Sequence, residues 1–283
     1  MKNLFTSFFT LVVFLVGTIA FAQNSNSLLW KVSGNGLEKP SYIFGTIHMI
    51  CEDDYFMNES VEKALADSEV LITEINFGNM AEMMQMQSAM QTDKPLKERI
   101  SSEQYNKLEK LLKAKLGLDI SDFNSVSEAG IASLVTVKSF PCEQQKMYEI
   151  ELFQKAMLSQ KKLNGLESIA EQMKVMQDHF NIEAIIKMLE DVGSADDTNK
   201  EMVTLYKEQK IDALLDLLKK ASYMDAKAYD EFVVIRNNNW IAKMPELMKS
   251  NAAFFAVGAA HLGSEDGVLE LLREKGYKVE AVN

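Results

Sequence analysis

The chain has 283 residues, 47% hydrophobic and 25% charged, with 13 glycines and 4 prolines, which is typical of a globular protein and excludes a disordered, collagen-like or repeat polymer. A formal net charge of −11 provides no positive field for nucleic acid or anionic lipid, so we expect no nucleic-acid partner. Three histidines and two cysteines exclude a zinc ribbon or a multi-histidine metal cage, so any chemistry must use very few such residues.

The N-terminus has the pattern of a secretory signal peptide. Lys2 precedes a long uncharged apolar stretch, and an A-x-A cleavage site ends at Ala22. No stop-transfer pattern follows, which favours cleavage over an uncleaved membrane anchor. The sequence therefore predicts a signal peptide over residues 1–22 and an exported mature chain, periplasmic or secreted, with no stable membrane insertion.

The two cysteines are expected to be joined. Export would place Cys51 and Cys142 in an oxidising compartment, where a lone pair of cysteines is more often bridged than free. The sequence predicts this disulfide, which closes a loop of about 90 residues, and two buried free thiols are the alternative.

Aromatic and β-branched residues near the start of the mature chain predict half of a sheet. Residues 28–32 and 41–48 flank a turn-rich Gly-Asn-Gly segment and are expected to form a hairpin, and residues 69–76 form a third strand. Asn58 is placed to cap a helix over residues 59–67.

The far end of the chain repeats this order of elements. Residues 254–257 read as a buried strand, Ser264 is placed to cap a helix that runs to Lys275, and residues 277–282 alternate as a closing strand. The two ends of the chain are therefore expected to share one sheet.

The middle of the chain, residues 78–250, is mostly helical in its periodicity, and Ser101 with Gln104 forms a capping box. Residues 162–168 are an exception and predict an inner strand or strand end. The predicted fold is mixed α/β (α+β), with a small mixed sheet built from both terminal regions, covered by helices, and a large helical insert. We expect one domain over residues 23–283.

Two of the three histidines have the same local sequence. Gly45-Thr-Ile-His48 and Gly258-Ala-Ala-His261 each end a predicted strand, which is a rigid place to present imidazole, and each has a glycine that permits close approach. The duplication favours a functional over a structural histidine pair. His179, on a polar helix, is expected at the surface.

Three further charged residues are candidates for the same site. Glu74 follows an apolar strand, where a charge is unfavourable unless it is paired or bound to metal, and an edge-strand position in solvent is the alternative. Glu167 follows Gly165 in a similar setting, although acids are also favoured at a helix start. Arg236 follows an apolar stretch, so its guanidinium either points into the site or pairs at the surface.

A methionine cluster lies at the start of the helical middle. Met83, Met86 and Met90 share one helical face. Packing in the core or under a lid is favoured over Cu(I) binding or an adaptable peptide surface.

These motifs resemble the TraB/PrgY/GumN family, which includes the Tiki metalloproteases. The resemblance is strongest over residues 41–48, 71–76 and 254–279, and in the helical middle it depends on Gly165-Leu-Glu167 and Arg236-Asn237. Membership implies a fold related to the erythromycin-esterase-like (EreA-like) and haem-binding ChaN-like proteins. For Tiki-like members it also implies divalent-metal-dependent peptide hydrolysis, with Mn or Co favoured and Zn possible.

The resemblance and the residue patterns together predict a catalytic metal site. His48, Glu74 and His261 would supply three ligands and leave an open position for water. Glu167 would act as general base or orient a histidine, and the roles of the two glutamates are interchangeable. Arg236, with Asn237 beside it in the motif, would stabilise the oxyanion that develops during cleavage of a peptide or protein substrate.

Two other classes of function are compatible with these residues. One is a non-catalytic protein that binds haem, metal or a hydrophobic ligand through the histidines, for which a wide apolar cleft between them would argue. The other is an interaction protein that keeps the fold without activity.

Overall fold

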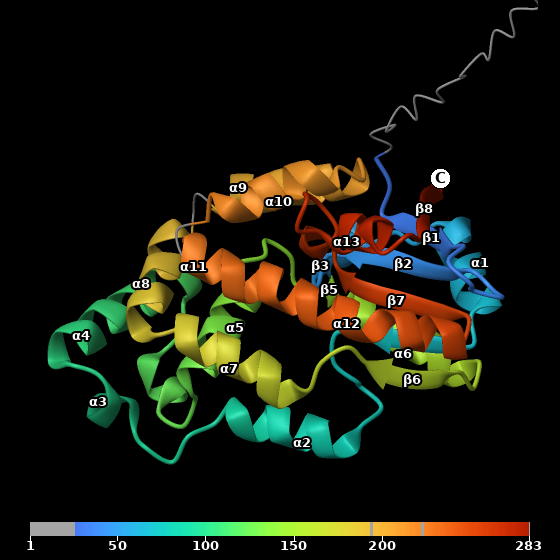
Figure 1. Cartoon of the computed structure of the whole chain (residues 1–283). Coiled ribbons are helices and arrows are strands. Elements are labelled where there is room, and N and C mark those ends of the chain that lie inside the picture. The colour runs from blue at the N-terminus through green and yellow to red at the C-terminus, as the bar shows by residue number, and fades with distance from the viewer. Residues whose placement is uncertain (1–25, 193–194, 222–223, 283) are drawn as a thin grey trace, which may run out of the picture.

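The computed structural model describes residues 26–192, 195–221 and 224–282. A six-stranded mixed sheet lies at one end of the molecule, and in it strands from the two ends of the chain lie side by side (Figure 1). This confirms the predicted mixed α/β fold. Across the sheet the order is β6 (Lys162–Gly165), β4 (Val70–Thr73), β7 (Ala253–Gly258), β2 (Ser41–Thr46), β1 (Leu29–Ser33) and β8 (Lys278–Val282).

The sheet combines a parallel and an antiparallel part. β6, β4, β7 and β2 are parallel, whereas β1 pairs antiparallel with both β2 and β8. The predicted hairpin and closing strand are therefore confirmed. All six residues of β7 are buried, which fits the continuous apolar run that a central parallel strand requires.

One strand prediction was wrong in its placement. The strand expected near residue 165 in the interior is β6, which pairs only with β4 and lies at the edge of the sheet. Its residues alternate between exposed and partly buried, and Lys162 is on the exposed face, as is usual for an edge strand.

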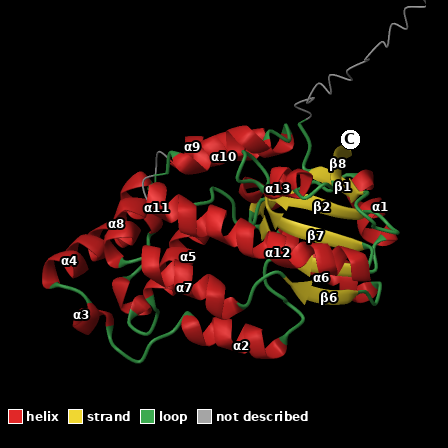
Figure 2. Cartoon of the chain, viewed as in Figure 1, coloured by secondary structure: helices red, strands yellow, loops and turns green. Residues whose placement is uncertain are grey.

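Helices cover the sheet, and the helices α3, α4 and α8 lie at the end of the molecule farthest from it (Figures 1 and 2). Two short strands, β3 (Ile50–Cys51) and β5 (Gln145–Lys146), form a separate antiparallel pair. The helices are α1 (Glu59–Asp67), α2 (Met80–Ala89), α3 (Leu96–Arg99), α4 (Ser102–Leu111), α5 (Glu128–Lys138), α6 (Tyr148–Leu158), α7 (Ile169–His179), α8 (Ile182–Asp191), α9 (Ala195–Lys207), α10 (Ile211–Lys219), α11 (Ala226–Tyr229), α12 (Ile235–Ser250) and α13 (Val268–Glu274).

Two of the three predicted helix starts have the expected position. α1 spans Glu59–Asp67 after Asn58, although the Asn58 side chain makes no capping hydrogen bond. The capping box of Ser101 and Gln104 is present in full at the start of α4.

The prediction that Ser264 caps the helix near the C-terminus was wrong. α13 begins at Val268, with Gly267 at the N-cap, because Ser264 adopts a φ of 67° and its N–H donates to Asp212 Oδ1. The chain then passes so close to itself that a Cβ at Gly267 would lie 2.3 Å from the carbonyl oxygen of Leu262. The glycine, not the serine, therefore determines where this helix begins.

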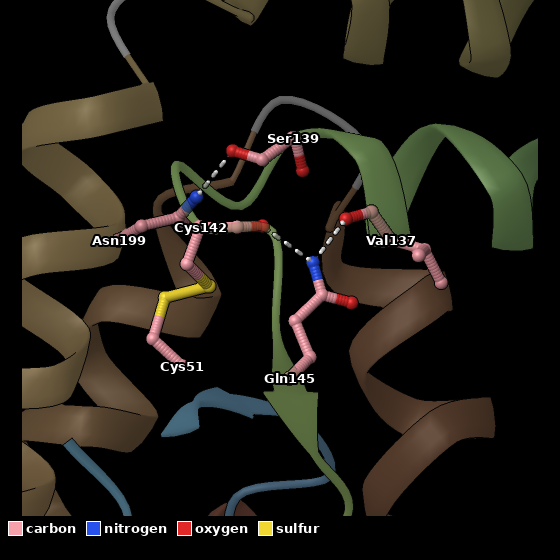
Figure 3. The surroundings of a disulfide bond; sticks show 6 residues. All are labelled: Cys51, Val137, Ser139, Cys142, Gln145 and Asn199. Carbon is pink, nitrogen blue, oxygen red and sulfur yellow. Dashed lines mark hydrogen bonds between the residues drawn. A yellow bond between two sulfur atoms is a disulfide. The ribbon is translucent and has the colours of Figure 1, made fainter. Parts of the chain in front are cut away.

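The cysteines and methionines have the expected placement. Cys51 and Cys142 form a disulfide that ties β3 to the loop before β5 (Figure 3). Met83, Met86 and Met90 are partly buried and pack on a small apolar cluster of Ile75, Ala129, Ile169 and Met173.

The predicted signal peptide, residues 1–22, lies outside the described residues. Among the helices that are described, none combines the length and the apolar character needed to cross a bilayer.

The fold brings the candidate site residues to one edge of the sheet. The four parallel strands end at the same edge, and such carboxyl ends are where open α/β sheets bind ligands. The segments that leave this edge carry His48 after β2, Glu74 after β4, Glu167 after β6 and His261 after β7.

Candidate functional site

The three predicted metal ligands surround one point at Gly258. The end of β2 is paired with the end of β7, so the two G-x-x-H motifs are neighbours. A Cβ built on Gly258 would lie 3.4 Å from His48 Nε2, 3.5 Å from Glu74 Oε1 and 3.5 Å from His261 Cδ2. The glycine therefore keeps open a small space that both imidazoles and one carboxylate face.

His261 is buried and its ring is fixed on both sides. Its Nδ1 lies 2.7 Å from Asn237 Oδ1, and its Nε2 lies 3.2 Å from Arg236 Nη1. An arginine can only donate, so Nε2 accepts and the ring proton is on Nδ1. Burial and the charge of Arg236 lower the pKa of His261 to about 3, so the ring is neutral.

Asn237 holds more than the histidine ring. Its Nδ2 donates to the carbonyl oxygens of His261 and Asp266, at 3.2 and 2.8 Å. The side chain is fully buried. Asn237 therefore fixes both the ring and the backbone of the second motif.

His48 has a different environment. Its side chain is 62% exposed, and its Nδ1 lies 2.9 Å from Oε1 of the buried Glu149, which also accepts from Thr46 Oγ1 at 2.6 Å. Partial desolvation by the neighbouring residues lowers the pKa of His48, but the charge and hydrogen bond of Glu149, with the charge of Glu74, raise it overall to about 9.

Arg236 connects the buried half of the site. Nη2 donates to Glu74 Oε2 and Glu167 Oε1, Nε donates to Glu167, and Nη1 donates to His261 and the carbonyl oxygen of Phe232. These bonds use all five N–H groups of the guanidinium. Burial opposes its charge, but the two carboxylates raise the pKa of Arg236 further above its usual value.

The backbone before Arg236 is also unusual. Residues Asp230–Val234 form a π-helical turn between α11 and α12, and this turn contains the Phe232 carbonyl that Arg236 contacts. Single π turns inside helices are frequent at functional sites. Arg236 also stacks on Trp240, with its guanidinium carbon 4.8 Å from the ring centre.

Glu74 is held in its ionised form. Its Oε1 accepts from the Gly258 N–H at 2.9 Å, and its Oε2 accepts from Arg236 and from Gln172 Nε2. Burial raises its pKa, but Arg236, both histidines and the Gly258 N–H lower the pKa of Glu74 well below its usual value. The carboxylate is therefore charged and available to a cation at the Gly258 side.

Glu167 lies against Arg236 rather than against a histidine. Its two oxygens accept from Arg236, from Gln172 Nε2 at 3.1 Å and from Trp240 Nε1 at 3.2 Å. Its backbone N–H donates to the Glu74 carbonyl, which ties the two site loops together. Burial outweighs these contacts and raises the pKa of Glu167.

The sequence analysis missed three contributors: Glu149, Gln172 and Trp240. Glu149 left a usable signal, because it occupies the apolar face of α6 with Leu152 and Ala156, where a charged residue requires a partner. We find no comparable signal for Gln172, whose surroundings are polar.

The prediction for His179 was wrong. Its side chain is only 11% exposed, its Nε2 lies 2.8 Å from Glu231 Oε2, and its ring packs against Phe232. α7 packs on the π turn that precedes α12, which covers this histidine. His179 therefore lies between α7 and the π turn and not at the open surface.

The donor types suit a divalent cation, but they do not form a closed cluster. Over residues 26–192, 195–221 and 224–282, no group of three or more His, Cys, Asp and Glu side chains is close enough to hold an ion. Two imidazoles with fixed Nδ1 contacts and one carboxylate around Gly258 nevertheless fit such a ligand. Ligation by His261 Nε2 requires Arg236 Nη1 to exchange its hydrogen bond.

A pocket of about 210 Å³ adjoins the site between α7 and α12, and Glu167 and Arg236 form part of its wall. Most of its lining residues are charged, and their carbon atoms contribute most of the exposed wall, so the pocket offers both ionic and apolar contacts. The lining residues are Glu167, Glu171, Lys174, Val175, Asp178, Glu231, Ile235, Arg236, Asn239 and Lys243.

These features define a class of protein with a mixed sheet whose parallel strands end in paired G-x-x-H motifs, a buried glutamate and a buried arginine. The chain belongs to the TraB/PrgY/gumN family, whose model matches residues 28–281. No curated protein and no solved structure matches the chain significantly.

Proposed function

We propose that this protein is an exported, divalent-metal-dependent hydrolase that cleaves peptide bonds. One observation carries the proposal: His48, Glu74 and His261 face a single open point at Gly258, and a hydrogen bond holds the Nδ1 of each histidine. Two histidines and one carboxylate are a common ligand set for catalytic metals.

The metal would be held by His48, Glu74 and His261, with Mn or Co favoured and Zn possible by family resemblance. When bound, such an ion supplies a water of lowered pKa and polarises the scissile carbonyl. Asn237 and Glu149 hold the imidazoles, while Arg236 keeps Glu74 ionised.

Glu167 and Arg236 have the chemistry for proton transfer and charge stabilisation. The raised pKa of Glu167 brings the carboxylate closer to the range of a general base. Arg236 can stabilise an oxyanion by exchanging its hydrogen bond to His261 or to the Phe232 carbonyl.

Export is supported by the A-x-A site ending at Ala22 and by the disulfide between Cys51 and Cys142. The charged pocket beside Arg236 would accommodate a polar stretch of a peptide or protein substrate.

A second candidate is a non-catalytic protein that binds metal, haem or a hydrophobic ligand. One observation favours it: the hydrogen bonds of Arg236 and Glu167 are already complete without a ligand. Turnover of peptides by the metal-loaded protein would separate the two candidates, because a binder would hold one equivalent of metal without cleavage.

The first experiment measures bound metal per chain, by mass spectrometry of the mature protein reloaded with Mn, Co or Zn. The double variant His48→Ala/His261→Ala is compared with His179→Ala, which removes the remaining histidine of the chain. We expect close to one equivalent in the wild type and in His179→Ala, and none in the double variant. Metal uptake that does not depend on His48 and His261 would overturn the proposal.

A further inference from the structure

We infer that Glu149 is the positioning residue of His48, whose ring it fixes so that Nε2 faces Glu74 and His261. The consequence for metal binding rests on the proposed function, whereas the fixed ring does not. Glu167, the residue expected to orient a histidine, contacts Arg236 instead.

The hydrogen bond between Glu149 and His48 has a defined direction. A carboxylate can only accept, so the contact of 2.9 Å between Glu149 Oε1 and His48 Nδ1 requires a proton on Nδ1. With Nδ1 engaged, Nε2 is the atom presented at Gly258, 3.4 Å from the position of a Cβ there. The contact therefore determines which ring nitrogen faces the site.

Glu149 is buried and only partly paired. Its side chain is 5% exposed, its Oε1 takes both Thr46 Oγ1 and His48 Nδ1, and its Oε2 has no hydrogen-bond partner among the described residues. A buried, incompletely paired carboxylate oxygen is unfavourable for folding. Stability alone therefore does not account for a glutamate at this position.

The segments that carry His48 and Glu149 are joined to each other. β3 follows His48 and β5 precedes Glu149, and the two strands pair through Ile50 with Lys146 and Cys51 with Gln145. The disulfide lies directly beside this pair (Figure 3). The donor His48 and the acceptor Glu149 therefore lie on two segments that are joined by strand pairing and by a disulfide.

The helix that carries Glu149, α6, is anchored at its first turn. The neighbouring Tyr148 is fully buried, and its hydroxyl donates to the Phe56 carbonyl at 2.6 Å. This contact anchors the first turn of α6 and so fixes the backbone from which the Glu149 side chain reaches His48.

The hydrogen bond can be tested without metal by NMR of 15N-labelled imidazoles. The three histidine signals are assigned with His48→Gln, His179→Gln and His261→Gln. We expect a solvent-protected Nδ1–H signal for His48 in the wild type, lost in Glu149→Ala and shifted upfield in Glu149→Gln, because a neutral acceptor bonds more weakly. The Nδ1–H signal of His261 should not change.

Metal affinity is measured on the same proteins with Mn, Co and Zn. We expect Glu149→Ala to bind about 10- to 100-fold more weakly than wild type, with Glu149→Gln in between. Glu143→Gln makes the same charge change at an exposed position nearby and should bind like wild type.

The outcomes are distinguishable. A His48 Nδ1–H signal that is unchanged in both Glu149 variants would overturn the inference, and Glu149→Gln alone decides this if Glu149→Ala does not fold. Wild-type affinity in the Glu149 variants would likewise overturn the effect on metal binding. If the wild type takes up no metal, the proposed function fails, and the ring signal still decides the positioning of His48.

Discussion

The two G-x-x-H motifs are alike in sequence and adjacent in the sheet, yet they have opposite surroundings. The side chain of His48 is 62% exposed, whereas that of His261 is 7% exposed. His48 is held by the carboxylate of Glu149, and His261 by the amide of Asn237. The pKa is raised to about 9 for His48 and lowered to about 3 for His261.

This difference shows which part of the chain determines each property of the site. The strands give both histidines the same position at the sheet edge, because β2 and β7 are parallel neighbours. The charge states differ because burial, together with Arg236 of α12, keeps His261 neutral, whereas Glu149 of α6 outweighs desolvation at His48. Of the two proposed ligands, His261 is therefore the fixed, neutral one and His48 is the accessible one.

The largest effect on stability should follow removal of the positive charge of Arg236, which lies beside the buried His261. Arg236→Met leaves Glu74 and Glu167 buried without their shared partner, and breaking such a pair costs about 3–5 kcal/mol in the free energy of unfolding. Urea titration measures this, with Lys63→Met as control, because its ion pair with Asp67 is exposed. A loss below about 1 kcal/mol would contradict the central place of Arg236.

A smaller effect on stability is expected from removing the disulfide, which lies near His48, the more exposed histidine. Cys51→Ala/Cys142→Ala should reduce the free energy of unfolding by about 2–4 kcal/mol, because it frees a loop whose ends are 91 residues apart. Hydrogen exchange should increase in residues 47–52 and 143–149 but not in residues 253–261. Equal acceleration in both regions would show that the two motifs are not separately braced.

The glycines of the two motifs should also respond differently. A Cβ at Gly45 would lie 2.8 Å from Leu262 Cδ1 and 3.1 Å from Ala259 Cα. Gly45→Ala should therefore lower the free energy of unfolding by about 1–3 kcal/mol through overpacking. Thermal unfolding at matched protein concentration checks this, and a stability equal to wild type would contradict the close approach of the motifs.

The smallest effect on stability is expected for Gly258→Ala. Its Cβ would lie 3.4–3.5 Å from its neighbours, which is ordinary contact, and its φ of −53° suits alanine, so the free energy of unfolding should change by less than about 1 kcal/mol. The methyl group would nevertheless fill the point that the three proposed ligands face. Metal uptake should therefore be lost, and retained uptake would place the ion elsewhere.

The sequence predicts much of the sheet and several residues of the site. The terminal strands are short apolar runs bounded by turn residues, and the paired glycine–histidine motifs mark the ends of β2 and β7. Glu74 and Arg236 could be singled out because a charge beside an apolar run requires a partner. The structure brings these residues together through strand order, which no single segment encodes.

The remaining features depend on tertiary packing. The start of α13 follows from a close backbone contact at Gly267 and not from the better capping residue Ser264. The burial of His179 depends on the π turn before α12. Likewise, the place of Glu167 against Arg236 rather than a histidine is a matter of side-chain geometry that spacing along the chain does not determine.

The position of β7 also has a consequence for how the protein is made. β7 is the second-last strand of the chain, yet it lies in the middle of the sheet, between β4 and β2. Until residues 253–258 have been synthesised, the earlier strands have unpaired edges and no common core, and such long-range pairing is slow. The sheet should therefore assemble only when synthesis is nearly complete, and truncation before Ala253 should leave two separate strand pairs, β6 with β4 and β2 with β1.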